Sequence, residues 1–235
     1  MTEPVDTGAP ARRMTKGERT RERILACAME LFSESGFSSV SLRDIAARAH
    51  MTHAGLLHHF SSKDELLLTA LERRDQIQGT QLSDGEGVRS VAAVRRLFAD
   101  VIVTVERNLA ERALVSMYVK ISAEASDVEH PAHTYFRRRY IKLRDVFGQA
   151  FAVWFEHVGR PVSQARIAGE RLIALMDGMQ LQWILGEGAS PAGTDMVEAV
   201  EQFFTSYDFT PTAAELAAAH AAIDARSPEE FTPSA

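Results

Sequence analysis

Apolar residues recur every three or four positions through most of this chain, which is the period of an α-helix with one buried face. The first such stretch begins at Glu18 and stops before Gly36, a residue suited to a left-handed helix C-cap. Its apolar face is formed by Ile24, Leu25, Ala28, Leu31 and Phe32. Cys27 lies beside that face, so we expect it to be a small core residue rather than a reactive thiol.

Three shorter helices are predicted next. Ser41 can cap a helix that buries Leu42, Ile45, Ala46 and Ala49. After a break at residues 50–51, Thr52 can cap a third helix, which buries Leu56, Leu57 and Phe60. Residues 62–65, Ser-Lys-Asp-Glu, have the form of a capping box and predict a fourth helix through Leu71. No strand-like alternation appears in this region.

The remaining chain is also predicted to be helical. A turn-rich break at residues 79–87 is followed by helical patterns at 91–105, 111–125, 131–158, 163–186 and 194–207. Pro131 is expected in the first turn of the 131–158 helix, where its missing N–H costs nothing. We therefore predict an all-α protein of nine or ten helices, with a flexible basic arm (1–17), a helix-turn-helix head (18–78), a larger helical bundle (88–208) and a C-terminal tail (209–235) that forms at most one weak helix.

Composition narrows the class of protein. No stretch approaches the roughly 18 consecutive apolar residues of a membrane helix, and the N-terminus lacks the apolar segment of a secretory signal. We therefore expect a cytoplasmic protein with no membrane partner. A single cysteine in 235 residues excludes an intramolecular disulfide and a thiolate metal cluster.

Charge is distributed unevenly along the chain. Residues 11–63 contain nine Lys and Arg against five Asp and Glu, an excess of four positive charges. The whole chain has a net charge of −6 and its first ten residues −2, so residues 64–235 carry −8. A basic head on an acidic body is expected when only the head meets phosphate. Chance clustering of solvated charge would give the same asymmetry.

The two short helices that start at Ser41 and Thr52 form a helix-turn-helix pattern. The second of these helices must fit the major groove, about 12 Å wide, and needs small or polar residues near its start. Residues 52–55, Thr-His-Ala-Gly, meet that requirement. Short helix pairs also occur in proteins that never touch DNA, so the spacing alone leaves the function open.

The residues from Glu18 to about Gln78 resemble the DNA-binding domain of the TetR (tetracycline-repressor-like) family. The resemblance rests on the Ile-Leu…Ala…Leu-Phe first helix, the Gly-Phe turn, Ser-x-Arg-Asp-Ile-Ala-x-x-Ala in the second helix and the ending His-Phe-x-x-Lys-x-Glu-Leu. It covers about a quarter of the chain without a gap. More loosely, HPAHTYFRRRY and LMDGMQLQWIL in the body look like regulators of that family common in actinobacteria.

Three departures from the family pattern concern the turn and the helix after it. His50 stands where the family has Gly, and His tolerates a left-handed conformation at modest cost. His58 replaces a Tyr that typically holds a phosphate. Ala54-Gly55 replaces Gly-Thr and removes a hydroxyl. The fold should survive these changes, whereas the base preference should differ.

The resemblance implies a role for each matching residue. Ser41 and Thr52 would contact backbone phosphates, Arg43, His53 and Ala54 would face the bases, and His58 and Lys63 would hold phosphates. A second group of basic residues could steer the arm along or into the minor groove: Arg12, Arg13, Lys16, Arg19 and Arg21. For any one of them, plain surface polarity is the alternative.

Metal and enzyme chemistry find little support in the sequence. His50, His53, His58 and His59 lie close together, but no acid or thiol completes a metal site. His130 and His133 are interrupted by a helix-starting Pro131. No nucleophile elbow, phosphate-binding glycine loop or catalytic acid pair is present. We therefore expect neither an enzyme, a metal nor a cofactor.

The body offers candidates for an effector pocket, which the resemblance places among its middle helices. Large side chains, some with a hydrogen-bonding end, suit a partly apolar organic ligand: Met117, Tyr118, Ile121, Phe151, Trp154, Met176, Gln180 and Trp183. Core packing is the alternative for each. In the family, the last two core helices form a four-helix dimer interface, for which the candidates are Leu172, Leu175, Met179, Met196, Val200, Phe203 and Phe204. An intrachain core is the alternative there.

The sequence thus predicts a homodimeric, DNA-binding transcriptional regulator, most often a repressor in this family, that releases a palindromic operator when a small organic effector binds. Two other functions stay open. One is a DNA-binding regulator that responds to a protein partner or acts constitutively, and the other is an all-α enzyme or metal-binding protein that has kept the head as a relic.

Overall fold

The computed structural model describes residues 14–77, 88–186 and 192–225, and within these ranges it contains helices and no strand. The all-α prediction and the predicted number of helices are confirmed. The elements of the described chain are α1 (Lys16–Ser35), α2 (Leu42–Arg48), α3 (His53–Leu57), α4 (Lys63–Ile77), α5 (Val91–Ala110), α6 (Arg112–Glu124), α7 (His133–Val158), the 3-10 helix η1 (Val162–Gln164), α8 (Ala165–Leu185), α9 (Ala192–Thr205) and α10 (Ala213–Asp224).

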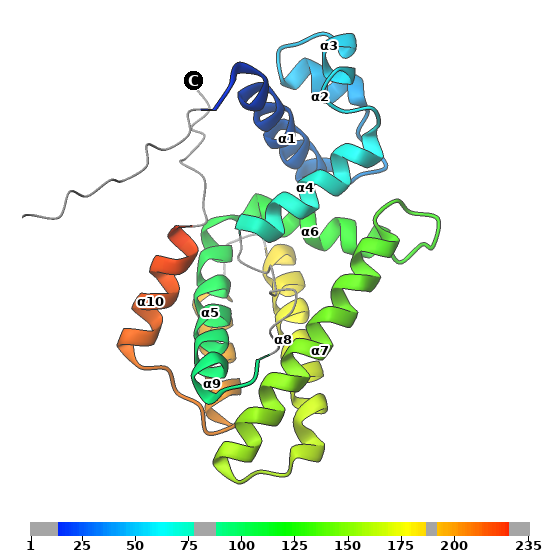
Figure 1. Ribbon diagram of the computed structural model, residues 1–235. Coiled ribbons are helices and arrows are strands. Elements are labelled where there is room, and N and C mark those ends of the chain that lie inside the picture. The colour runs from blue at the N-terminus through cyan, green and yellow to red at the C-terminus, as the bar shows by residue number, and fades with distance from the viewer. Residues whose placement is uncertain (1–13, 78–87, 187–191, 226–235) are drawn as a thin grey trace, which may run out of the picture.

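Helices α1 to α4 form a small group at one end of the molecule, and α5 to α10 form the larger body (Figure 1). Helix α1 starts with a capping box, in which the Thr15 hydroxyl and the Glu18 carboxylate each bind the other's backbone N–H. Its predicted apolar face is buried, with Ile24, Ala28 and Phe32 fully inaccessible to solvent. None of the described helices is both long and apolar enough to span a bilayer.

The body is organised around Phe98 of α5. Its ring centroid lies 4.5 Å from that of Phe204 in α9, 4.9 Å from that of Phe151 in α7 and 5.2 Å from that of Phe209. Helices α7 and α8 pack along each other in a hairpin closed by Gly159, which adopts the left-handed conformation with φ 76°. The apolar faces of the body helices are therefore largely buried in the core that these helices form with one another.

Helix α6 lies between the head and the body (Figure 1). One continuous cluster of buried residues contains Phe32 and Leu67 of the head together with Met117, Tyr118 and Ile121 of α6. The Lys120 ammonium donates to two backbone carbonyls at the C-terminal end of α1, where a positive charge suits the helix dipole. Head and body thus share a core as well as hydrogen bonds.

Glu124, the last residue of α6, holds the turn after α1. Its Oε1 accepts from the N–H of Phe37 at 3.0 Å, and its Oε2 accepts from the N–H of Ser38 at 3.1 Å. Gly36 precedes these residues with φ 76° and ψ 173°. The positive φ agrees with the sequence prediction, whereas the ψ value corrects the expected left-handed C-cap.

One other expectation is corrected. Helix α7 begins at His133, so Pro131 lies in the turn before the helix and not in its first turn. Within the expected tail, the described residues 209–225 contain one helix, and they pack on the body: Phe209 is fully buried, and α10 packs on α5 through Ala219 and Ile223. Small alanines on both helices, Ala99 and Ala219, allow this close packing. Alanine contributes little to a hydrophobicity pattern, so the pattern predicted only a weak helix.

Helix α10 is fastened by an ion pair that responds to pH. Arg95 of α5 donates from Nε and Nη2 to the two carboxylate oxygens of Glu215, at 2.5 and 2.9 Å. These hydrogen bonds, helped by the capping box at Thr212, lower the pKa of Glu215 from 4.5 to about 2.

The lowered pKa predicts acid release of α10. A carboxyl whose pKa is lower in the folded state stabilises it above the unfolded pKa, and this contribution is lost as the pH falls from about 4.5 towards 2. We expect hydrogen-exchange protection factors in α10 to drop in that window. In a Glu215→Gln variant, protection of α10 should be weaker at neutral pH and nearly flat across the window; an equally steep drop in both proteins would contradict the prediction.

Candidate functional site

Helices α2 and α3 form the predicted helix-turn-helix, and hydroxyl caps fix the start of each. The Ser41 Oγ accepts from the Asp44 N–H at 3.2 Å, and the Asp44 carboxylate accepts from the Ser41 N–H and hydroxyl. The Ser41 hydroxyl and N–H lower the pKa of Asp44. The Thr52 Oγ1 accepts from the Gly55 N–H at 3.0 Å. Both helices therefore start at residues that the sequence predicted.

The turn between these helices depends on His50. This residue has φ 53°, in the left-handed region, as expected for a position where the family pattern has Gly. The Met51 N–H donates to the Ala46 carbonyl at 2.9 Å, which closes the turn. A side chain is thus accommodated at the tightest point of the motif.

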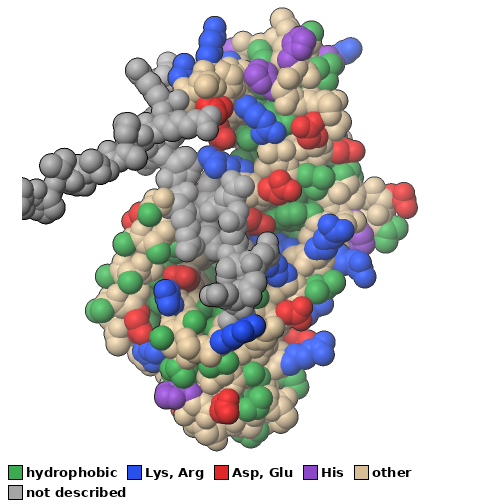
Figure 2. Space-filling view, viewed as in Figure 1, with side chains coloured by type: hydrophobic (Ala, Val, Ile, Leu, Met, Phe, Trp, Pro, Cys, Tyr) green, Lys and Arg blue, Asp and Glu red, His purple; other side chains and the backbone are tan. Residues whose placement is uncertain are grey.

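Helix α3 presents small and polar side chains at one end of the molecule. Thr52, His53 and Ala54 are exposed, as are Arg43 of α2 and His58 after α3. Histidines and basic residues gather at the top of the surface in Figure 2, which is the end occupied by α2 and α3 in Figure 1. On the inner side, Leu56 is fully buried, whereas Leu57, which was expected to be buried with it, is exposed. The arrangement leaves a short polar helix free to enter a groove.

Lys63 occupies a different environment from these exposed residues. Its Nζ donates to the carbonyl oxygens of Phe37 and Val40, both at 2.9 Å, and lies 4.0 Å from the centroid of the Phe37 ring. The ammonium therefore links the start of α4 to the loop between α1 and α2. A phosphate contact by Lys63 would have to share the charge with these two carbonyls.

The arm residues are only partly described. Arg12 and Arg13 lie outside the described residues. Lys16 is exposed, and Arg19 donates to the Met14 carbonyl at 2.8 Å. Arg21 lies over the Phe60 ring, 4.2 Å from its centroid. In this structure its guanidinium thus covers a core aromatic ring.

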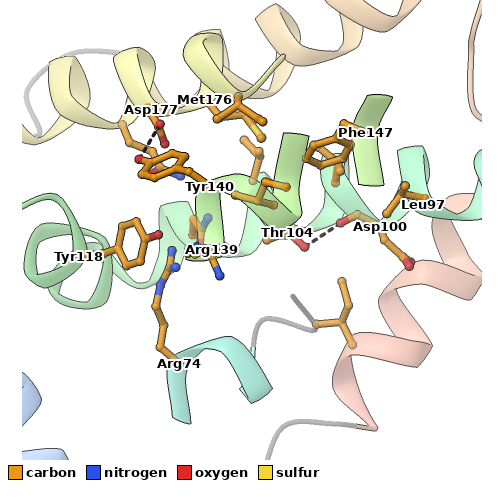
Figure 3. Close-up of a pocket in the computed structure, with 17 residues that line it drawn as sticks. Arg74, Leu97, Asp100, Thr104, Tyr118, Arg139, Tyr140, Phe147, Met176 and Asp177 are labelled. Atoms are coloured by element: carbon orange, nitrogen blue, oxygen red, sulfur yellow. Dashed lines mark hydrogen bonds between the residues drawn. The ribbon is translucent and has the colours of Figure 1, made fainter. Parts of the chain in front are cut away.

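The body contains a cavity of about 110 Å³ between α4, α5, α6, α7, α8 and α10. Figure 3 shows its lining: a polar end with Arg74, Tyr118 and Arg139, and an apolar part with Leu97 and Phe147. A cavity of roughly 150 Å³ can hold a benzene ring. The space is somewhat smaller than that, and it suits a small organic group.

Three of the eight predicted pocket residues line this cavity: Tyr118, Met176 and Gln180. The other five do not, because they pack in the core: Met117, Ile121, Phe151, Trp154 and Trp183. The indole of Trp154 illustrates the difference, since its N–H donates to the Tyr207 carbonyl at 2.8 Å. Its hydrogen-bonding end is therefore satisfied inside the protein.

Sequence reasoning missed the charged residues of the cavity, namely Arg74, Asp100, Arg139 and Asp177. Arg74 carried a signal: it follows Leu67 and Leu71 at i+7 and i+3, so it lies on the buried face of α4. Arg139 and Asp177 come from α7 and α8, and only the packing of those helices brings them to the cavity.

The residues predicted for a dimer interface fall into two groups. Four of them have no solvent-accessible surface and belong to the core of the body: Leu172, Met196, Val200 and Phe204. The other three are half-buried: Leu175, Met179 and Phe203. A different set of apolar residues is exposed on α8, namely Ile167, Leu181 and Leu185, with exposed fractions of 49, 46 and 70%.

His130 and His133, which lie at or just before the start of α7, have hydrogen-bond partners close in sequence. The His130 Nδ1 accepts from the Ala132 N–H at 3.2 Å, and the His133 Nδ1 lies 2.9 Å from the Ala125 carbonyl. In the part of the chain that the structure describes, no three His, Cys, Asp or Glu side chains are arranged to hold a metal.

Comparison with known proteins agrees with the fold and the head. Residues 24–70 match the sequence profile of "Bacterial regulatory proteins, tetR family". The transcriptional regulator UidR of Escherichia coli K12 is 34% identical over 110 residues, which are 47% of this chain and 54% of UidR. The match thus spans only about half the length of that relative.

Two further proteins match over most of the body as well. HdnoR of Paenarthrobacter nicotinovorans, a nicotine-responsive transcriptional repressor, is 25% identical over 183 residues, 76% of this chain and 90% of HdnoR. The solved structure of NalD, a repressor of the MexAB-OprM efflux pump in Pseudomonas aeruginosa, covers 81% of this chain and 96% of its own, with a TM-score of 0.63 and 25% identity. These relatives are named as transcriptional regulators, and this chain resembles them in fold and, over residues 24–70, in the sequence pattern of the tetR family of bacterial regulatory proteins.

Proposed function

We propose that this protein is a homodimeric repressor that binds a palindromic operator through α2 and α3 and releases it when a small organic molecule occupies the body cavity. The observation that carries the proposal is the position of Arg74. This residue belongs to α4, the last helix of the head, and it also lines the cavity. A bound molecule would thus touch the head and the body at once.

The head supports the DNA-binding part of the proposal. Exposed Arg43 and His53 suit base edges, and exposed Thr52 and His58 suit phosphates or sugar. The relatives UidR and HdnoR are named as helix-turn-helix transcriptional regulators. HdnoR is named as nicotine-responsive, which is a precedent for control by a small molecule in a protein of similar length.

The exposed stripe of α8 supports the dimer. Ile167, Ala174, Leu181 and Leu185 are all exposed and follow one another at helical spacing. Gly178 lies between them, and apart from its chain neighbours and its own helix backbone no atom lies within 4 Å of the position that a Cβ would occupy there, so a second helix could approach closely. Two-fold pairing through this stripe would present two copies of α3 to half-sites about 34–36 Å apart.

Arg43 and Arg48 offer a matched test of the DNA-binding surface, because both are exposed arginines of α2. Arg48 is already paired with Glu30 and Glu34, with N–O distances of 3.2 Å in each pair. Arg43→Ala should weaken operator binding by about 1–3 kcal/mol, or roughly tenfold to a hundredfold, whereas Arg48→Ala should change it little. The operator would first be isolated from genomic fragments retained by the protein and then titrated by fluorescence anisotropy.

Three outcomes would overturn parts of the proposal. A protein that retains no genomic duplex at low salt would refute DNA binding. A monomer in sedimentation experiments with bound operator would refute the dimer. Operator binding that no compound from a broad library of small organic molecules releases would refute control by an effector and favour a regulator without one.

A further inference from the structure

Arg74 is a buried charge, and two of its three guanidinium nitrogens have no hydrogen-bond partner among the described residues. Its side chain is 3% exposed, and the two nitrogens are Nε and Nη1. The guanidinium lies over the Tyr118 ring, 3.7 Å from its centroid. A cation–π contact offsets part of the cost of burial, but it satisfies no N–H group.

The nearest carboxylate is committed to other residues. The Oδ1 of Asp75 lies 3.8 Å from the Arg74 Nη1, and it accepts instead from the Nη1 of Arg139 at 2.6 Å. The Oδ2 of the same carboxylate accepts from the Tyr135 hydroxyl. Both guanidinium groups therefore face the Asp75 carboxylate, and Arg74 lies farther from it than Arg139 does.

A charge left in this state is costly. Burial lowers the pKa of the Arg74 guanidinium, yet arginine stays protonated in proteins. Removing a cation from water without an equivalent partner costs several kcal/mol. Proteins rarely keep such a group unless something else completes it, and here the group opens onto a cavity.

The other walls of the cavity indicate what would complete it. Half of the sixteen other lining residues are apolar: Leu97, Val101, Val105, Leu143, Phe147, Ile173, Met176 and Ile223. Two carboxyls also line it. Asp177 accepts from the Tyr140 hydroxyl at 2.8 Å, and burial raises its pKa, which disfavours its charge. Asp100 lies on α5, away from Arg74 and Tyr118 (Figure 3).

We propose that the Arg74 end of the cavity is a carboxylate-binding subsite, and that the effector is a small monocarboxylic acid with an apolar body. The planar fork of a guanidinium matches a carboxylate. Asp100, away from Arg74, selects against a second negative charge, so a dicarboxylate should bind less well. The inference rests on the proposed function, because it names the chemical class of its effector.

The test compares acids with their uncharged amides on the protein without DNA. The probes are benzoate, cyclohexanecarboxylate and hexanoate, each paired with its amide, at neutral pH. We expect at least one acid to raise the Tm and to bind about tenfold or more tightly than its amide in calorimetric titration, because a hydrogen bond to a charged group is worth about 1.5–3 kcal/mol.

Arg74→Met should abolish the preference for acids while the protein still folds, since the variant removes an uncompensated buried charge. Arg73→Met is the matched control: it removes a neighbouring charge of α4 that pairs with Glu22 and does not line the cavity. This control should keep the preference.

The inference would be overturned if no acid bound, if acids and amides bound alike, or if Arg74→Met kept the preference for acids. The comparison of acid with amide on the unchanged protein decides the matter even if Arg74→Met failed to fold. Operator release is measured separately. Acid binding without release would keep the subsite and refute the effector response, whereas release by uncharged compounds alone would keep the response and refute the subsite.

Discussion

Replacing Phe98 with alanine is expected to lower the free energy of unfolding by about 3–5 kcal/mol. The ring is fully buried and contacts aromatic rings from α7, α9 and the segment before α10. Its removal would leave a cavity at the point where four segments meet, and these helices cannot all move inward to fill it.

Urea denaturation followed by circular dichroism measures this loss. Arg96→Ala is the control, because it lies two residues earlier on the exposed side of the same helix, and it should stay within about 0.5 kcal/mol of the parent protein. A loss below about 1 kcal/mol for Phe98→Ala would show that Phe98 is not at the centre of the body core.

The second large effect is expected for Gly36→Ala, at about 3 kcal/mol. The backbone at φ 76° and ψ 173° is accessible almost only to glycine and costs other residues about 1–3 kcal/mol. A Cβ at this position would also lie 2.3 Å from Oε1 of Glu124. The carboxylate would have to move and give up its hydrogen bonds to Phe37 and Ser38.

Two variants make this prediction specific. Gly17→Ala is the matched control, because its Cβ would meet nothing closer than 4.0 Å, and alanine is the better helix former there; it should be neutral or stabilising. Combining Gly36→Ala with Glu124→Ala should cost less than the sum of the two, since both changes remove the same hydrogen bonds. Additive losses in thermal or urea unfolding would rule out the shared cause.

Local signals in the sequence predicted the head well. The hydroxyl caps at Ser41 and Thr52, the apolar faces of α1 and α2 and the left-handed His50 are all properties of a few neighbouring residues. Such properties are visible in sequence because their partners lie within four positions of each other. The family resemblance added the expectation that the head binds DNA, which spacing alone left open.

The cavity was predicted less well, because its lining depends on long-range packing. Large aromatic side chains such as Phe151 and Trp154 looked suited to a ligand, but they fill the core. The cavity instead lies beside the charged side chains of Arg74 and Arg139, which come from α4 and α7. Lys63 shows the same limit, since the carbonyls that hold its ammonium are 23 and 26 residues away in sequence.

The core that α6 shares with the head has a consequence for protein engineering. A chimera joined between α4 and α5 would give the head of one regulator to the body of another, but it would cut through the cluster that contains Phe32, Leu67, Met117 and Ile121. A head transplanted without α6 would expose the apolar residues that α6 normally covers, such as Phe32 and Leu67. A working exchange of operator specificity has to carry matching α6 residues along, or confine the exchange to the outward side chains of α2 and α3.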